Sequence, residues 1–235
     1  MTLNTTKCKV MRFSRRENSS PVAYTISSSL LTPVESYKYL GVILTSDITW
    51  KAHVSSIIAS ANRMLGYLKR NFYLAPTPVK LLLYKSLVRS KLEYANSVWD
   101  PFTNTLIDAL EAVQNRAARF IVRNYDRASS VTEIKNSLSL TPLALRRKVS
   151  RLCLFFKIYS MNSTLKEALI TTPTYVSSRI DHSRKVGVPR CRTASCINPF
   201  IPKTSSEWNH LPPHIVAAKD VDEFRALLSL HYGLP

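Results

Sequence analysis

The amino-acid sequence predicts an α+β fold that is mostly helical. Up to residue 46, apolar and polar residues alternate in short runs, which is typical of a small antiparallel β-sheet. Apolar residues then recur every three or four positions, which predicts a bundle of amphipathic helices. A proline-rich tail carries one more helix. We therefore expect four regions: a β-sheet at 1–46, a helical domain at 47–160, a linker at 161–190 and a tail subdomain at 191–235.

Three strands account for the predicted sheet. The first alternates apolar side chains with lysine and arginine from Cys8 to Phe13, and a polar turn follows at Arg15–Ser20. The second strand, Val22–Ile26, is a short run rich in β-forming residues. The strongest strand signal of the sequence is the run YKYLGVIL at Tyr37–Leu44. We expect the three strands to pair in antiparallel fashion.

Two long helices open the helical domain. The first begins near Trp50, and its apolar residues continue at helical spacing to Leu68. Pro76 and Pro78 begin the second helix, because proline fits the first turn of a helix, and Pro101 follows its end. We expect this second helix to turn five apolar side chains inward: Val79, Leu82, Leu83, Leu87 and Val88.

The remaining helices have strong periodicity or clear start signals. The third helix spans about Thr105–Asn124. A short fourth helix begins at Ser130, where a glutamate three residues on completes a capping box. The fifth helix, Pro142–Ser160, is the most basic one. The helix of the tail, Val221–Leu230, has a negatively charged first turn that begins at Asp220.

The chain is strongly basic, and its charge is uneven. It holds 33 Lys and Arg against 15 Asp and Glu, a net charge of +18. Residues 1–160 contain 24 of the basic and 9 of the acidic residues. Surfaces that serve only solubility carry charges of both signs, so this excess of positive charge indicates contact with nucleic-acid phosphates. Lysine and arginine hold phosphates without recognising the base sequence. Solvated helix faces are the alternative interpretation.

Candidate phosphate contacts lie on several helices. Arg116, Arg119 and Arg123 are spaced by three and four residues, so they share one helical stripe. The other candidates from the helical domain are Arg70, Lys80, Lys85, Arg89, Arg146, Arg147 and Arg151. Tyrosines interleaved with these cations either stack on bases or form edges of the core. They are Tyr37, Tyr39, Tyr67, Tyr73, Tyr84 and Tyr94.

Several kinds of site are excluded or disfavoured. The four glycines are too dispersed for a phosphate-binding loop. Carboxylates do not cluster as two-metal phosphoryl transfer requires, and no serine lies in a nucleophile elbow. No apolar run is long enough to span a membrane, and the first twenty residues do not resemble a signal peptide. We expect an intracellular protein, nuclear or cytosolic rather than secreted, that binds no cofactor and no membrane.

The four cysteines are expected to be free thiols, because nothing in the sequence indicates secretion. A zinc site is the alternative, since four side chains approach the spacing of a two-Cys, two-His finger: Cys191, Cys196, His210 and His214. Against this alternative, Pro213 lies between the two histidines and would break the helix on which a finger carries them.

Five strings are recognisable together. They are LNTTKCKVMRFSR at 3–15, SYKYLGVILTSDITWKAHV at 36–54, LVRSKLEYANSVWDP at 87–101, LEAVQNRAARFIV at 110–122 and PFIPKTSSEWNHLPPHIV at 199–216. They resemble the reverse transcriptase of a non-LTR, LINE-type retrotransposon, and in particular the part downstream of the polymerase active-site aspartates. The resemblance covers nearly the whole chain.

The resemblance implies roles for particular residues. Asn4 and Lys7 match an N-x-x-K element of the palm, whose lysine lies near the incoming nucleotide. Tyr39, Leu40 and Gly41 match the primer-grip strand. The helices that follow match the thumb and its connection, which clamp a primer–template duplex by its backbone. The implied partners are RNA, DNA or an RNA–DNA hybrid.

In that family, the fingers, the first palm motifs and the catalytic aspartates would lie upstream of residue 3. We therefore expect this chain to be a non-catalytic fragment that binds nucleic-acid backbones. Two alternatives stay open. The chain docks onto a reverse transcriptase through an exposed palm edge, as its partner or as its competitor. Or it is a decayed transposon copy without a selected role.

Overall fold

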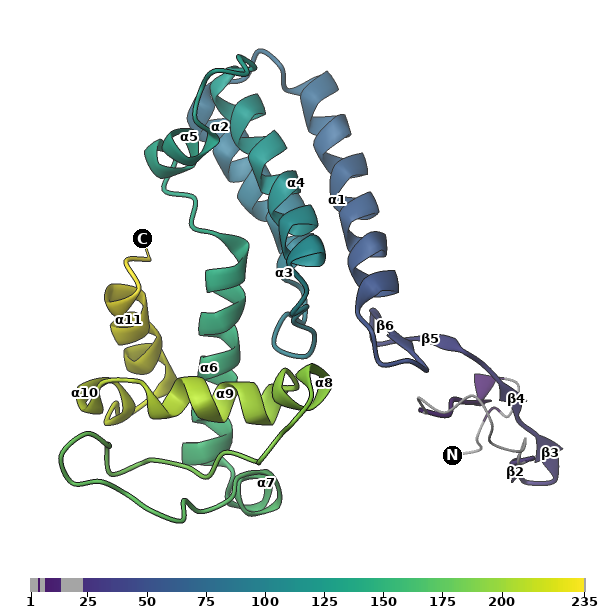
Figure 1. Cartoon of the computed structure of the whole chain (residues 1–235). Helices are drawn as coiled ribbons and strands as arrows, with labels where there is room; N and C mark the ends of the chain where they lie inside the picture. Colours follow the sequence, from purple (N-terminus) through teal and green to yellow (C-terminus); the bar gives the residue numbers. More distant parts are fainter. Residues whose placement is uncertain (1–3, 5–6, 14–22, 235) are drawn as a thin grey trace. The chain divides into compact units, whose positions relative to one another are not determined.

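The computed structural model describes residue 4 and residues 7–13 and 23–234 (Figure 1). It is mostly helical with small β-sheets, consistent with the predicted α+β class. The chain divides into two compact units, residues 1–60 and residues 61–235. Helix α1 (Lys51–Asn71) begins in the first unit and ends in the second. The predicted turn at Arg15–Ser20 lies outside the described residues.

The strands of the first unit form separate pairs. Among the described residues there are three two-stranded sheets and no three-stranded one, so the prediction of a single antiparallel sheet is wrong. One pair is even parallel. The pairs are β1 (Lys9–Val10) with β4 (Thr32–Pro33), β2 (Thr25–Ile26) with β3 (Ser29–Leu30), and β5 (Ser36–Tyr39) with β6 (Val42–Thr45).

The predicted strand at Tyr37–Leu44 is a hairpin. Leu40 and Gly41 have φ angles of 45° and 85° and form its turn, because two consecutive residues with positive φ match the twist of the flanking strands. The apolar run therefore reverses direction at its centre. The hairpin is joined to the start of α1, where the Ile43 N–H donates to His53 Nδ1 at 3.3 Å and Val54 is fully buried. This contact explains why the first unit extends past residue 46.

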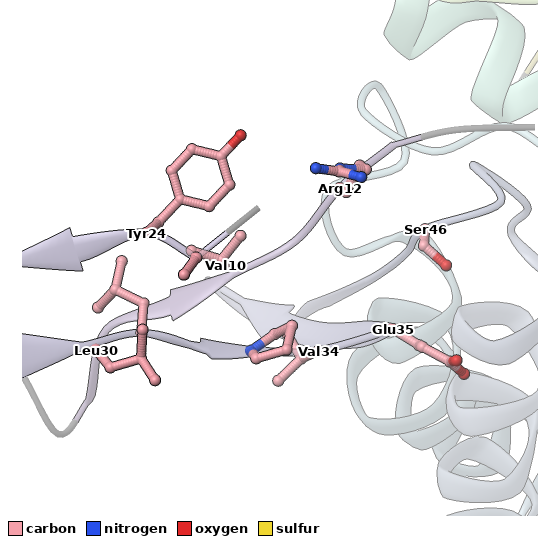
Figure 2. A pocket seen from close by; sticks show the side chains of 10 residues that line it. Val10, Arg12, Tyr24, Leu30, Val34, Glu35 and Ser46 are labelled. Carbon is pink, nitrogen blue, oxygen red and sulfur yellow. The ribbon is translucent and has the colours of Figure 1, made fainter. Parts of the chain in front are cut away.

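A pocket of about 550 Å³ opens among the short strands of the first unit (Figure 2). Its walls are mainly apolar, and Val10, Leu30 and Val34 contribute to them. Arg12 and Glu35 are its charged members, so the pocket itself carries no excess of positive charge. It does not have the character of a phosphate site.

The second unit is helical. The predicted helices are all present within a few residues of their expected bounds, and the short ones between them were not predicted. The Ser130 and Asp220 side chains accept backbone N–H bonds at the helix starts, as expected. After α1, the helices are α2 (Thr77–Leu83), the π-helix η2 (Tyr84–Arg89), α3 (Ser90–Glu93), α4 (Asn104–Val122), α5 (Val131–Ser137), α6 (Leu143–Met161), α7 (Ser163–Leu169), α8 (Ala194–Ile197), α9 (Phe200–Asn209), α10 (Pro213–Val216) and α11 (Val221–His231).

The segment α2–η2–α3 buries a different face from the predicted one. Its buried residues step by four: Lys80, Tyr84, Val88 and Leu92. Tyr84 is fully buried, and its hydroxyl donates to Gln114 Oε1 of α4 at 2.8 Å. The prediction is confirmed for Val88 but wrong for Val79, Leu82 and Leu87, which are exposed. Because the segment packs through Tyr84 and the stem of Lys80, the face that carries Leu82 and Leu87 is exposed.

The core that α6, α9 and α11 form in the second unit is centred on Trp208 of α9, which is fully buried. Its ring lies 5.2 Å from that of Phe155 on α6 and 5.7 Å from that of Phe224 on α11, measured between centroids. Its Nε1–H donates to the Arg184 carbonyl oxygen at 2.8 Å. Figure 1 shows α9 crossing α6, with α11 alongside. The predicted tail subdomain at 191–235 is therefore packed on the fifth predicted helix.

The predicted linker at 161–190 also belongs to this core. It begins with α7, and His182 and Val186 farther along are buried. His182 Nε2 lies 3.0 Å from the Trp208 carbonyl oxygen, and the Gly187 N–H donates to the Thr171 carbonyl oxygen at 2.7 Å. These bonds are made largely by backbone atoms, which leave no hydrophobic periodicity in the sequence. The linker interpretation is therefore wrong.

Candidate nucleic-acid interface

The predicted cations of α6 are used inside the protein. The side chains of Arg147 and Arg151 are 1% and 3% exposed, and both bond to Asp100 in the segment between α3 and α4. Arg151 also pairs with Glu207 on α9, and Lys203 donates to Asp100 at 2.6 Å. We call these five residues the Asp100 network. Because their guanidinium groups are buried and paired, Arg147 and Arg151 are not surface phosphate contacts, and that prediction is corrected.

Burial raises the pKa of Asp100, but Arg151, Lys203 and Arg147 lower it more, so its pKa lies below its ordinary value. The carboxylate stays ionised at neutral pH and holds α6 and α9 to the segment before α4. Sequence reasoning missed this role, because Asp100 lies about fifty residues from both arginines and belongs to no local pattern.

A second carboxylate, Glu93 at the end of α3, holds two more of the predicted cations. Arg146 of α6 donates to both of its oxygens, one of them at 3.1 Å. Arg89 lies 3.7 Å from the same carboxylate. Burial lowers the pKa of Arg89, and the nearby Arg146 lowers it further. Arg146 therefore ties α6 to α3, whereas Arg89 pairs with a residue one turn farther along its own helical segment, and both contribute little unpaired charge to the surface.

Lys80 is buried against aromatic rings. The residue is 1% exposed, and its Nζ lies 5.1 Å from the Phe120 ring centroid and 5.9 Å from that of Tyr73. Burial lowers the pKa of Lys80, and Arg123 lowers it further. This burial does not fit a direct phosphate contact, so we remove Lys80 from the candidate surface. Lys85, one turn on, is half-buried.

Three of the remaining predicted cations lie where the end of α1 meets α4. Arg116 of α4 donates to Asn62 Oδ1 of α1 at 3.0 Å. Gly66 lies one helical turn after Asn62 on α1, and the Arg70 side chain folds back over it. A Cβ at Gly66 would lie 3.5 Å from Arg70 Nη1. Arg123 lies at the end of α4 and donates to the Tyr73 carbonyl oxygen. Together with Lys69, these residues form what we call the basic patch: Lys69, Arg70, Arg116 and Arg123.

The positive charge of the basic patch is not neutralised. Among the described residues, no carboxylate lies within ion-pair distance of any of its four cations. Burial lowers the pKa of Lys69, and the neighbouring Arg116 lowers it further. A bound anion would relieve this repulsion, so the patch has the electrostatics of an anion site.

Arg119, the middle member of the predicted stripe, has a structural role. Its guanidinium donates to the carbonyl oxygens of Asp126 at 2.6 Å and Ser129 at 3.1 Å. These bonds fix the loop that follows α4. The chain turns into this loop at Arg123, whose φ of 57° lies in the left-handed region. Within the stripe, Arg116 and Arg123 are therefore exposed cations, whereas Arg119 is held by hydrogen bonds within the protein.

Aromatic rings line the basic patch. Tyr73 and Tyr125 are each 53% exposed. The Arg123 guanidinium lies 4.8 Å from the Tyr73 ring centroid, and Lys69 Nζ lies 6.0 Å from that of Tyr125. Of the six tyrosines singled out in the sequence, only Tyr84 belongs to the core. Tyr125 was missed, because its position beside Lys69 depends on the fold of the loop after α4.

The predicted palm residues lie in the first unit. Lys7 is exposed, and so are Tyr39, Leu40 and Gly41, which form the turn end of the β5–β6 hairpin. The structure thus presents these three residues at a surface, on a hairpin rather than in the middle of a strand. Their predicted contacts with nucleic acid stay predictions.

The cysteine predictions are partly corrected. Cys191 and Cys196 form a disulfide, whereas Cys8 and Cys153 are free. The disulfide removes both thiolates of the alternative zinc site, and the described residues contain no group of three or more side chains arranged for a metal ion. His210 instead bonds through Nδ1 to the Ser206 carbonyl oxygen. In the described part of the chain, no helix is long and apolar enough to cross a membrane.

Two curated proteins are similar to about half of this chain. One is the RNA-directed DNA polymerase from mobile element jockey of Drosophila funebris, 30% identical over 126 residues, which are 52% of this chain. The other is the probable RNA-directed DNA polymerase from transposon X-element of Drosophila melanogaster, 26% identical over 125 residues, or 51% of this chain. Over that half, the similarity supports a region derived from a non-LTR retrotransposon reverse transcriptase. This confirms the resemblance carried by the sequence motifs.

The reverse-transcriptase-derived region is a small part of the enzymes that it matches, because the similarity spans 13% of the length of each relative. No family model matches the chain. No solved structure matches it either.

Proposed function

We propose that this reverse-transcriptase-derived chain binds the phosphate backbone of RNA, DNA or an RNA–DNA hybrid through the basic patch, and that it does not polymerise by itself. The observation that carries the proposal is the contrast within the second unit. Arg146, Arg147 and Arg151 on α6 are paired with carboxylates, whereas the four cations of the basic patch have no carboxylate partner among the described residues. Unpaired cations that converge at one surface are the electrostatic footprint of phosphate binding.

The comparisons support the choice of ligand. Both relatives are named RNA-directed DNA polymerases. In our proposal, the helical second unit acts as a clamp that follows the backbone, as expected of a thumb. Phosphate contacts of this kind position a nucleic acid without selecting its sequence.

The absence of polymerase activity is the second part of the proposal. Glu93, Asp100, Glu111 and Glu207 are occupied by lysine or arginine partners within the second unit. Carboxylates that neutralise cations in this way are not available to hold a pair of magnesium ions, which two-metal phosphoryl transfer requires. This arrangement gives these four carboxylates a structural role rather than a catalytic one.

The experiment compares two variants with the same loss of charge. Lys69, Arg70 and Arg116 are replaced by glutamine in the patch variant. The control variant replaces Lys157, Lys219 and Arg225, which are exposed elsewhere on the second unit. Fluorescence anisotropy with labelled single-stranded RNA, RNA–DNA hybrid and duplex DNA should show affinity about tenfold lower or worse for the patch variant, across unrelated sequences. Equal affinities of the two variants would overturn the proposed site.

A primer-extension assay with magnesium tests the second part. We expect the wild-type chain to bind a primer–template without extending it. Extension above a no-protein control would contradict the proposed lack of catalysis, while leaving the binding site unaffected.

Protein docking is a second candidate, favoured by the hairpin of the first unit. All four residues of β5 are exposed, and among the described residues β5 pairs with β6 alone. A strand edge of this kind can pair with another chain. In this candidate function, the hairpin docks onto a reverse transcriptase.

The test is co-purification with a reverse transcriptase. The Lys38→Pro change removes a strand N–H. Co-purification that survives nuclease treatment and is lost in this variant would support docking. Loss of co-purification on nuclease treatment would refute it.

A further inference from the structure

The basic patch carries two half-exposed rings whose positions are fixed by cations. Arg123 donates to the carbonyl oxygen of Tyr73 while its guanidinium stands over the ring of the same residue. Tyr125 lies in the loop that Arg119 ties down through the carbonyl oxygens of Asp126 and Ser129. The rings are therefore held in place before any ligand arrives, which lowers the entropy cost of binding.

Each ring still has surface to offer. A little over half of the surface of Tyr73 and of Tyr125 is exposed, even though Arg123 and Lys80 lie near the first ring and Lys69 lies near the second. Tyrosines in a core bury this area, as Tyr84 does completely. Exposed rings next to uncompensated cations are the arrangement with which proteins hold single-stranded nucleic acids: the cations follow the phosphates and the rings stack on successive bases.

Stacking on a side chain requires an accessible base face. In a duplex, the faces of the bases are covered by their neighbours, so an aromatic side chain gains this contact only with unpaired bases or at the end of a helix. A surface with lysine and arginine alone would bind duplex and single strand through the same phosphates. The tyrosines therefore add a preference that the cations do not have.

We propose that Tyr73 and Tyr125 stack on unpaired bases, and that the basic patch accordingly selects single-stranded RNA or DNA over duplex. This inference rests on the proposed function, because the phosphates must be held by the same patch. It identifies the class of ligand: a strand with at least two accessible bases beside its bound phosphates. It does not require recognition of base edges, so the preference is independent of sequence.

The test is a double variant, Tyr73→Leu with Tyr125→Leu, which removes both rings and keeps every charge of the patch. The matched control is Tyr175→Leu, since Tyr175 is 71% exposed and has no cation over its ring in the described residues. A second double variant, Tyr73→Phe with Tyr125→Phe, keeps the rings and loses only the hydroxyls. Thermal unfolding confirms that each variant is folded.

Affinity is measured for a single-stranded oligonucleotide that contains 2-aminopurine, and for the duplex of the same sequence. We expect the double leucine variant to bind the single strand about tenfold more weakly or worse, to lose the quenching of 2-aminopurine and to bind the duplex as before. The control and the phenylalanine variant should behave like the wild type.

Three outcomes would overturn the inference. If the leucine variant binds both ligands as the wild type does, while the patch variant binds both more weakly, stacking is wrong and phosphate binding stands. If the leucine variant loses equal affinity for single strand and duplex, the rings only hold Arg123 and Lys69 in place. If the wild type binds neither ligand, the proposed function itself fails.

Discussion

Asp100 accepts a hydrogen bond at 2.9 Å from Nε of Arg147, and thereby ties the segment before α4 to the first half of α6. Arg147 is almost fully buried, and its neighbour in the network, Arg151, reaches both Asp100 and Glu207. Two cations that resemble a nucleic-acid contact in the sequence are thus part of the protein's interior. Because they are buried, the candidates for phosphate binding are the basic-patch cations at the end of α1 and on α4.

Replacing Asp100 should destabilise the second unit strongly. Asp100→Ala leaves Arg147 and Arg151 buried without a full set of partners, which costs about 3–5 kcal/mol of unfolding free energy. Urea denaturation followed by circular dichroism measures this loss. Asp108→Ala is the matched control, because Asp108 is exposed on α4 and forms no ion pair among the described residues. Similar unfolding free energies for the two variants would contradict a structural role of the network.

Arg119 should matter for stability, and Arg116 for binding. Arg119→Gln removes charged donors from the carbonyl oxygens of Asp126 and Ser129, which costs about 1–3 kcal/mol of unfolding free energy. Arg116→Gln should change stability by no more than about 0.5 kcal/mol, since Arg116 is exposed. Chemical denaturation and nucleic-acid anisotropy on both variants separate the two roles. A reversed pattern would show that the wrong arginine was assigned to the ligand.

The first unit should loosen as the pH falls. Burial lowers the pKa of His53 below 6.5, and Lys38 lowers it further. A histidine that is harder to protonate when folded stabilises the fold above its unfolded pKa, and this contribution is lost as the pH falls below about 6.5. The Ile43 amide, which donates to His53 Nδ1, should therefore be less protected at about pH 5.5 than at about pH 7.5.

Hydrogen exchange corrected for intrinsic rates measures this protection. His53→Gln supplies the control, because its amide oxygen can accept the same bond but does not titrate. The pH dependence should disappear in that variant. If it persists unchanged, another group is responsible.

Alkylation distinguishes the disulfide from four free thiols. Denatured but unreduced protein should take up two alkyl groups, at Cys8 and Cys153, and four after reduction. Mass spectrometry counts them. The Cys191→Ser variant should take up three without reduction, because its former partner becomes free. Four groups on the unreduced wild-type chain would mean that Cys191 and Cys196 are thiols, as the sequence alone suggested.

Much of the helical architecture can be predicted from local pattern. In α1 and α4, apolar residues recur every three or four positions of the sequence and so reveal the buried face. Ser130 and Asp220 mark helix starts, because their side chains accept backbone N–H bonds. The face of α2–η2–α3 could not be predicted in this way. Its buried positions include a lysine stem and a tyrosine, whereas Leu82 and Leu87, which are apolar like core residues, are exposed.

The candidate site was only partly accessible to sequence reasoning. The excess of positive charge is visible in the composition, but which cations are neutralised depends on carboxylates distant in the chain, as Asp100 and Arg147 show. The pairing of Tyr125 with Lys69 likewise depends on the loop after α4. Local patterns indicate the class of ligand, whereas the fold determines which of the predicted cations reach the surface.

The salt dependence of binding tests directly whether the basic patch holds phosphates. The dissociation constant for one single-stranded RNA is measured over a series of salt concentrations for the wild type and for the patch and control variants. We predict that the slope of log affinity against log salt becomes smaller by about 2 in the patch variant, because three phosphate contacts are lost, and is unchanged in the control. Equal slopes for the patch and control variants would show that the basic patch does not hold the phosphates.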